Sequence, residues 1–171
     1  MPGFEAGLSL GSNMGDKAAN IAGAMQRLAD SALVKIKAMS GLYRTAPWGK
    51  IDQDFFANAA ALVTTQLPPL ELLALAKKIE ADMGRVKTEH WGPRLIDIDL
   101  LFYGDLVLDD PLLNLPHREM FNRAFVLVPL AEIAAGRRIG GRLVGEAARA
   151  MAGAGVARWE TPNREPSGSP V

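Results

Sequence analysis

The spacing of apolar positions changes along this chain, and each change predicts a different kind of element. In residues 17–30 the apolar side chains recur at i, i+4 and i+7, which predicts a helix with one buried stripe. The stripe consists of Ile21, Met25 and Leu28. Asp16 is placed to cap the N-terminus of this helix. Residues 33–39 (LVKIKAM) instead alternate apolar with basic or small side chains, which is typical of a half-buried strand.

The same pattern predicts further helices and strands. Pro68 and Pro69 start a helix that Gly84 ends, and its apolar stripe is Leu72, Ala76, Ile79 and Met83. Strands are predicted at 6–10, 56–66, 95–102 and 106–108, with Gly104 and Asp105 in a turn between the last two. Helical patterns return at 129–135 and 143–152.

The first six predicted elements run β-α-β-β-α-β, which is the order of the ferredoxin-like split βαβ unit. We therefore predict an α+β fold with an antiparallel sheet, two helices on one face, and later elements added around them. The length of 171 residues favours one domain, expected at 1–159. Residues 160–171 are rich in Pro, Ser and Gly and poor in apolar residues, so we predict a disordered tail.

Composition and charge restrict the function. The 19 basic and 19 acidic residues cancel, which argues against a nucleic-acid partner because phosphate-backbone binding needs a basic surplus. The sequence contains no cysteine, so disulfides, zinc thiolates and thiol nucleophiles are excluded. No apolar run reaches the ~18 residues of a membrane span, and the first ten residues lack the features of a signal peptide. We expect a cytoplasmic monomer that acts on small molecules.

The clearest chemical signal is the sequence Asp97-Ile98-Asp99 inside an apolar strand. Side chains alternate along a strand, so the two carboxylates project to one face about 6.6 Å apart along the chain. The opposite, core-facing side is predicted to carry Ile96, Ile98, Leu100 and Phe102. Neighbouring carboxylates repel unless a cation lies between them, and hard oxygen ligands suit one or two Mg²⁺ ions. Two solvated aspartates at the end of a strand are the alternative.

Residues 84–94 (GRVKTEHWGPR) form an irregular segment directly before the acidic pair. Arg85, Lys87 and Arg94 supply three positive charges, which a polyphosphate bridged to Mg²⁺ would need. The alternative is that these charges are only solvated and that Trp91 fastens the loop to the core.

Aromatic residues and one amide gather in a second region. Trp48, Phe55 and Phe56 offer flat apolar faces, and Asn58 offers amide donors and an acceptor, a mixture that suits a planar heterocycle. A purely structural aromatic cluster is the alternative. His117, after a proline, is by itself more typical of a structural histidine.

Five segments together resemble the 6-hydroxymethyl-7,8-dihydropterin pyrophosphokinase family. They cover most of residues 5–135 and read LGSNMGD (10–16), YRTAPWG (43–49), FFANAAALV (55–63), GRV…HWGPRLIDIDLLFYG (84–104) and LPHREMFNRAFVLVPLAEI (115–133). The resemblance implies a ferredoxin-like, three-layer αβα sandwich, extended here by C-terminal helices and a short hairpin. It implies Mg²⁺-dependent transfer of pyrophosphate from ATP to the hydroxymethyl pterin, a step of folate biosynthesis.

The resemblance also implies roles for individual residues. Two Mg²⁺ ions would be held by Asp97 and Asp99, with Arg85 and Arg94 as further catalytic residues on the polyphosphate. The ATP side would comprise Lys77, Glu80, Arg85, Lys87, Arg94, Ile98, His117, Arg118 and Arg123. The pterin side would comprise Thr45, Pro47, Trp48, Phe56, Asn58, Trp91 and Phe125. The chain departs from the family pattern at Trp48, Phe56, Lys87, Leu112 and Arg118, which concerns ATP affinity and pterin fit rather than the reaction.

Three other functions fit parts of this pattern. Another Mg²⁺-dependent phosphoryl or nucleotidyl transferase on a ferredoxin-like fold is the nearest. A non-catalytic ligand-binding domain of the same fold would have no use for the acidic pair after a basic loop. An RNA-binding module would need stacked aromatic residues on the sheet and a basic surplus.

Overall fold

The computed structural model describes residues 3–45, 55–84 and 95–159. Its central sheet has the strand order β10-β3-β4-β1-β5, and β2 also pairs with β4. All of these pairings are antiparallel. The strands are β1 (Phe4–Ser12), β2 (Val34–Met39), β3 (Tyr43–Thr45), β4 (Phe56–Thr65), β5 (Asp97–Tyr103) and β10 (Val156–Arg158).

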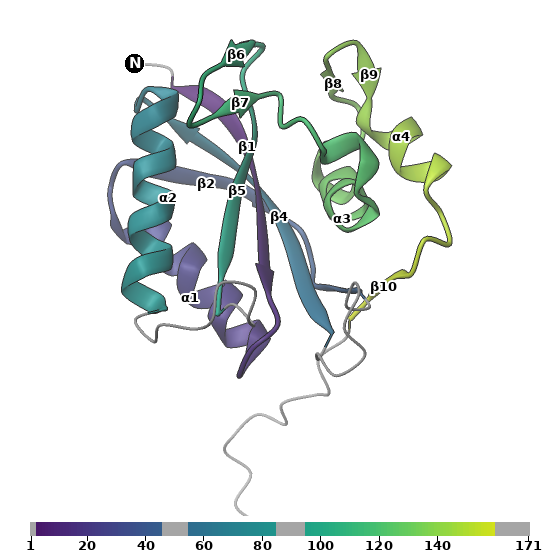
Figure 1. Ribbon diagram of the computed structural model, residues 1–171, viewed down its shortest axis with the longest axis horizontal. Helices are drawn as coiled ribbons and strands as arrows, with labels where there is room; N and C mark the ends of the chain where they lie inside the picture. Colours follow the sequence, from purple (N-terminus) through teal and green to yellow (C-terminus); the bar gives the residue numbers. More distant parts are fainter. Residues whose placement is uncertain (1–2, 46–54, 85–94, 160–171) are drawn as a thin grey trace, which may run out of the picture.

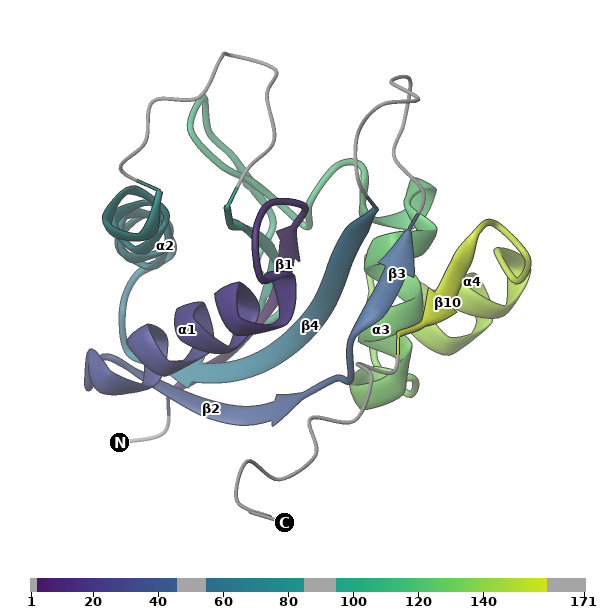
Figure 2. The ribbon, with the colours of Figure 1, turned by 90° about the horizontal axis from the view of Figure 1, so that it is seen from below.

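Helices cover both faces of this sheet (Figures 1 and 2). One face carries α1 (Lys17–Asp30) and α2 (Pro69–Met83), and the other carries α3 (Ala124–Ala134) and α4 (Val144–Ala150). Two small hairpins and a short 3-10 helix complete the described part: β6 (Leu108–Asp109) with β7 (Asn114–Leu115), β8 (Arg138–Ile139) with β9 (Arg142–Leu143), and η1 (Met120–Asn122). The predicted α+β class is confirmed. None of the described helices is long and apolar enough to cross a membrane.

Local sequence determines the ends of the first two helices. The Asp16 side chain accepts a hydrogen bond from the Ala19 N–H at 3.1 Å, as predicted for the N-cap of α1. Pro69 is the first residue of α2, and Gly84 follows its last residue, Met83. The apolar stripe of each helix packs against the sheet and forms the larger core with Leu8, Leu10, Ile98 and Leu100, and only Met83 at the end of α2 is partly buried.

A β-bulge in β5 corrects one prediction about this core. Gly7 pairs with Phe102, while Leu8 pairs with Leu100, so β5 contains one extra residue between the two pairs. Phe102 therefore packs with Leu101 in the second core, beneath α3, and not with Ile98 in the first. A Cβ atom at Gly7 would lie 2.2 Å from the Phe102 ring, so this position of the ring requires glycine at residue 7.

Several other elements differ from the predictions. The YRT segment, for which no strand was predicted, is a strand of the sheet, β3. Helix α3 begins at Ala124 rather than near 129, because Val126, Leu127 and Leu130 are buried and offset the helical hydrogen bond that Pro129 cannot donate. The strand predicted at 106–108 begins only at Leu108, since Val107 is exposed and unpaired. Residues 160–171, the predicted tail, lie outside the described residues.

Candidate functional site

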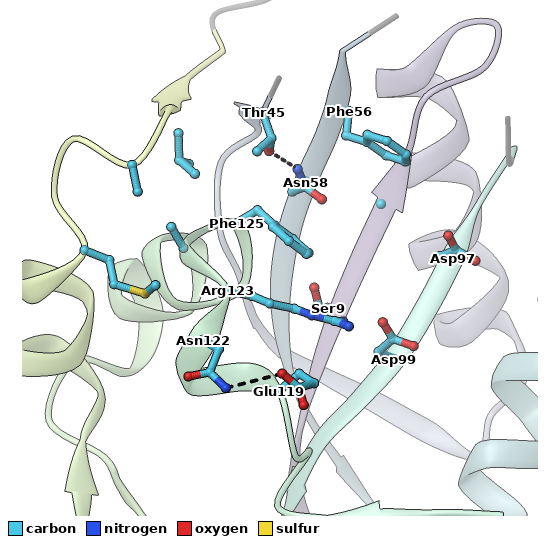
Figure 3. A pocket seen from close by; sticks show the side chains of 15 residues that line it. Ser9, Thr45, Phe56, Asn58, Asp97, Asp99, Glu119, Asn122, Arg123 and Phe125 are labelled. Atoms are coloured by element: carbon cyan, nitrogen blue, oxygen red, sulfur yellow. Dashed lines mark hydrogen bonds between the residues drawn. The ribbon is translucent and has the colours of Figure 1, made fainter. Parts of the chain in front are cut away.

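A pocket of about 960 Å³ lies on the face of the sheet that carries α3, beside the N-terminal end of that helix (Figure 3). Its floor comes from five strands and its side from the segment that leads into α3. The lining residues are Ser9, Gly11, Thr45, Phe56, Asn58, Asp97, Asp99, Glu119, Asn122, Arg123, Ala124, Phe125, Met151, Ala154 and Val156.

The register of the strands explains why residues far apart in sequence meet here. Gly11 of β1 lies directly between Asp97 of β5 and Asn58 of β4, and Ser9 lies opposite Asp99. Because side chains alternate along a strand, all of these positions face the same side of the sheet. The absence of a side chain at Gly11 leaves open floor between the carboxylate and the amide.

The two aspartates line one side of the pocket, both on the edge strand β5 (Figure 3). Within the described ranges, no group of three or more His, Asp or Glu residues could hold a metal ion. A cation bound here would therefore take two carboxylates from these residues and complete its coordination with water or ligand oxygens. That donor set fits Mg²⁺, which usually keeps waters and shares phosphate oxygens.

The amide of Asn58 is held in one orientation. Its side-chain N–H donates a hydrogen bond to the Thr45 hydroxyl, and both side chains are buried in the floor of the pocket. The amide oxygen then lies over the open position, 3.2 Å from where a Cβ atom of Gly11 would stand. A fixed amide with a bare floor beside it can read the edge of a flat polar ring.

Arg123 and Phe125 enter the pocket from the start of α3. The Arg123 carbonyl accepts the Val126 and Leu127 N–H groups at 3.0 Å, which anchors the first turn of the helix. The Arg123 guanidinium lies 5.7 Å from the centre of the Phe125 ring, and its side chain extends across the pocket toward the aspartates (Figure 3). It is the one cation among the described lining residues.

Glu80 lies outside the pocket but supports the strand that carries the aspartates. Its carboxylate accepts the Ile98 N–H at 2.7 Å and pairs with Lys77 at 3.3 Å. Burial raises the pKa of Glu80, while the Ile98 N–H and the Lys77 charge partly lower it again. The Ile98 side chain is fully buried in the first core, so its backbone alone is near the surface of this edge.

His117 and Arg118 have different surroundings. The backbone N–H of His117 donates to the Leu101 carbonyl at 2.8 Å, and its Nδ1 accepts the Glu119 N–H at 3.1 Å. Burial lowers the pKa of His117, and Arg123 lowers it further, against the opposing effect of Asp99. Neither His117 nor Arg118 lines the pocket. Arg118 is exposed, and it pairs with Asp109 at 3.2 Å.

Six of the residues predicted for the site lie outside the described ranges: Pro47, Trp48, Arg85, Lys87, Trp91 and Arg94. The described part of the chain brings together the two aspartates with Thr45, Phe56, Asn58, Arg123 and Phe125. Lys77, Glu80, Ile98, His117 and Arg118 lie outside the lining of this pocket.

Sequence reasoning missed three groups of lining residues, and one of them, Glu119, Asn122 and Ala124, surrounds the predicted Arg123 in sequence. Ser9 and Gly11 could have been found, because they alternate with Leu8 and Leu10 and belong to a strand beside the aspartates. The C-terminal group, Met151, Ala154 and Val156, carries no local signal. Within this group, Val156 is brought to the pocket by the pairing of β10 with β3.

Comparisons with known proteins point to one family. The family model described as 7,8-dihydro-6-hydroxymethylpterin-pyrophosphokinase matches residues 7–135. A 2-amino-4-hydroxy-6-hydroxymethyldihydropteridine pyrophosphokinase of Methylorubrum extorquens is 51% identical over 153 residues, covering 90% of this chain and 97% of that protein. A protein of the same description from Pseudomonas aeruginosa is 42% identical over 135 residues, covering 77% of this chain and 82% of that protein.

Solved structures agree at the level of the fold. A crystal structure of Plasmodium falciparum HPPK-DHPS matches with a TM-score of 0.71 at 18% identity, covering 86% of this chain. This chain spans 45% of that longer protein, and 36% of the bifunctional protein FolKE of Lactococcus lactis, to which it is 43% identical.

Proposed function

The chain belongs to the 7,8-dihydro-6-hydroxymethylpterin pyrophosphokinase family and is a diphosphotransferase of folate biosynthesis, and we propose how its pocket performs this transfer. The proposed donor is ATP, the acceptor is the hydroxymethyl group of the dihydropterin, and the products are the pterin diphosphate and AMP. We propose two Mg²⁺ ions, held by Asp97 and Asp99, and a cytoplasmic monomer.

One observation carries this proposal. A pair of carboxylates and a fixed amide lie in one pocket on neighbouring strands, separated by the bare floor at Gly11. The carboxylates suit a magnesium-bound polyphosphate, and the amide suits a polar heterocycle. A polyphosphate bound at the carboxylates and a heterocycle bound at the amide would have their reacting atoms close together over Gly11.

The acceptor is assigned to the side of the pocket near Asn58. The proposed contacts are hydrogen bonds from the ring edge to the Asn58 amide, with the Phe125 and Phe56 rings against the ring faces. Thr45 supports them because its hydroxyl holds the amide in place. Pro47, Trp48 and Trp91 are assigned to the same substrate on sequence grounds alone.

The nucleotide is assigned to the side of the aspartates. Arg123 would neutralise part of the phosphate charge and hold ATP in line with the acceptor. Lys77, Glu80, Ile98, His117 and Arg118 are proposed for the rest of the nucleotide, and their position around the aspartate strand supports this. Arg85, Lys87 and Arg94 are assigned to the polyphosphate on sequence grounds.

The proposed step is an in-line displacement that needs positioning and charge neutralisation more than covalent help. The hydroxymethyl oxygen bonds to the β-phosphorus of ATP. At the same time, the bond breaks between that phosphorus and the oxygen that bridges it to the α-phosphorus. AMP leaves with the bridging oxygen, and the hydroxyl proton passes to solvent. Bound Mg²⁺ would neutralise the phosphate oxygens and lower the pKa of the acceptor hydroxyl.

We also propose that the core is ferredoxin-like within a three-layer αβα sandwich. The strand order β5-β1-β4-β2, with α1 and α2 on one face and α3 and α4 on the other, supports this. Fold alone would not distinguish an enzyme from a binding domain, whereas the acidic pair in the pocket favours the enzyme.

The direct test is incubation with ATP, Mg²⁺ and hydroxymethyl dihydropterin, followed by separation of the nucleotides. We expect AMP and pterin diphosphate in equal amounts, and no product when Mg²⁺ is chelated. Formation of ADP, or AMP formation that does not depend on the pterin, would favour a different phosphoryl or nucleotidyl transferase.

A further inference from the structure

Ser9 differs from the other buried serine and threonine residues because its hydroxyl has no hydrogen-bond partner. Ser9 is 7% exposed and lines the pocket, yet its side chain forms no hydrogen bond within the described part of the chain. The other buried hydroxyls of this kind are all bonded: Ser12 to the Asn20 side chain, Ser40 to the Ala60 N–H, Thr45 to the Asn58 side chain and Thr65 to the Leu67 N–H.

The Ser9 hydroxyl is open to the pocket. Among the described side chains, the one enclosed nitrogen or oxygen atom without a partner is Nε of Arg137, so the Ser9 oxygen is not sealed in the core. Figure 3 shows it on the floor of the pocket, between the Asn58 and Asp99 side chains. A polar group in an otherwise buried position costs free energy unless water or a ligand bonds to it. The hydroxyl is therefore available to a bound molecule.

The strand register places this hydroxyl on the aspartate side of the pocket. Ser9 of β1 lies directly opposite Asp99 of β5, whereas Asn58 of β4 pairs with Gly11, two positions farther along β1. Side chains directly opposite each other have Cβ atoms about 4.5–5.5 Å apart, and diagonal neighbours are about 7–8 Å apart. Ser9 is thus closer to the side assigned to the nucleotide than to the amide assigned to the pterin.

The charges of the pocket favour an uncharged donor at this position. The described lining contains three carboxylates, those of Asp97, Asp99 and Glu119, and one cation, Arg123. A bound Mg²⁺ would neutralise charge, but it contacts only some of the oxygens of a polyphosphate. The remaining oxygens need hydrogen-bond donors, and a bond to a charged oxygen is stronger than one between neutral groups.

We infer that the Ser9 hydroxyl donates a hydrogen bond to a non-bridging phosphate oxygen of the nucleotide bound beside Asp99. This inference rests on the proposed function, because the occupant is the proposed pyrophosphate donor. The roles assigned above do not include Ser9. It adds to the floor of the pocket a phosphate contact that comes from β1, in addition to the residues assigned on β5 and at the start of α3.

The test removes one hydroxyl from either face of the same strand. Ser9→Ala removes the pocket hydroxyl, and Ser12→Ala is the matched control, because Ser12 faces the other side of the sheet and bonds Asn20 at 3.1 Å. Dissociation constants are measured separately for the dihydropterin and for a non-hydrolysable ATP analogue at saturating Mg²⁺. Ser9→Ala should weaken binding of the analogue by about tenfold and leave pterin binding within about twofold. Ser12→Ala should lower the melting temperature and leave both constants within about twofold.

The Mg²⁺ concentration separates a direct phosphate contact from an effect through Asp99. A hydroxyl that only orients Asp99 would be needed at low Mg²⁺ and not at saturation, so a loss that disappears at saturating Mg²⁺ would overturn the inference. Ser9→Thr keeps the hydroxyl and should bind the analogue within about threefold of the wild type. A loss in Ser9→Thr as large as in Ser9→Ala would assign the effect to the shape of the floor, and would also overturn it.

Two further results distinguish this inference from the proposed function. Normal analogue binding in Ser9→Ala, or equal losses for both ligands, would overturn the role of Ser9 while an active wild-type enzyme retains the proposed function. A wild-type enzyme that forms no AMP from the pterin would overturn both.

Discussion

The two faces of the central sheet use the same strands for different purposes. On the face covered by α1 and α2, strands β1, β4 and β5 present only apolar side chains to the first core: Leu8, Leu10, Ala57, Ala59, Ile98 and Leu100. One position along on each strand, the opposite face presents Ser9, Gly11, Asn58, Asp97 and Asp99 to the pocket. A shift of one residue along a strand therefore separates the side chains that stabilise the core from those that line the pocket.

The difference follows from how far the helices cover each face. On the pocket face, α3 and α4 pack over Ala60, Leu62, Leu101 and Phe102, which form the second core. Beyond these residues the face is open, and its positions on β1 and β5, together with Asn58 of β4, are small or polar. Charged and amide groups are costly to bury without partners, so they occupy the part of the sheet that a ligand and water can reach.

The aspartates should produce the largest effect on activity. Asp97→Ala or Asp99→Ala should lower turnover by about a thousandfold, because phosphate charge would no longer be neutralised through a bound cation. The melting temperature should not fall, since removing one of two neighbouring carboxylates relieves repulsion. AMP formation at saturating Mg²⁺ and thermal unfolding measure the two effects. Near-normal turnover in either variant would contradict the metal assignment.

Leu100, which directly follows Asp99 but faces the first core, should behave in the opposite way. Leu100→Ala should lower the free energy of unfolding by about 2–5 kcal/mol, because it leaves a cavity in the first core. The protein that remains folded should retain its turnover. Leu112→Ala is the matched control, because that leucine is 75% exposed and should change stability by no more than about 0.5 kcal/mol. Denaturant titration of both variants distinguishes them, and equal losses would argue against the burial of this face.

Asn58 should affect one ligand and not the other. Asn58→Ala should weaken binding of the dihydropterin by about 1–3 kcal/mol, because groups of the bound ring lose their hydrogen bonds. Binding of an ATP analogue should change little. Separate calorimetric titrations test this, and equal losses for both ligands would mean that Asn58 has only a structural role in the floor.

The smallest predicted effect concerns the attachment of α3 to the pocket face. Burial, together with the hydrogen bond to Glu132 and its charge, raises the pKa of Tyr43 from 10.0 to about 12. A raised pKa of the folded state stabilises the protein below pH 10, and this stability is lost as the pH rises from 10 through 12. The free energy of unfolding lost between pH 8 and pH 11 should be about 1 kcal/mol smaller in Tyr43→Phe than in the wild type.

Urea unfolding at pH 8 and pH 11 measures this difference in wild type and Tyr43→Phe. Tyr103, whose pKa burial also raises, is present in both proteins and serves as an internal reference. The same loss in both proteins would show that the link between Tyr43 and Glu132 does not contribute to stability in this pH range.

The sequence by itself determined what depends on neighbouring residues. The period of apolar positions gave α1 and α2 with their buried stripes, and Asp16 and Gly84 gave two of their ends. Alternation along one strand was enough to place Asp97 and Asp99 on one face. Asn58 and the aromatic residues near it were identified by their chemistry alone, and they line the same pocket as the aspartates.

Tertiary structure decided what depends on distant partners. The bulge opposite Gly7 moved Phe102 to the other face, and nothing in the alternation of β5 indicated it. The hydrogen bond that fixes Asn58 requires Thr45, which β3 brings alongside. Val156 reaches the pocket only through the pairing of β10 with β3. Periodicity records which side of an element is apolar, whereas the identity of its neighbour depends on contacts between residues far apart in the chain.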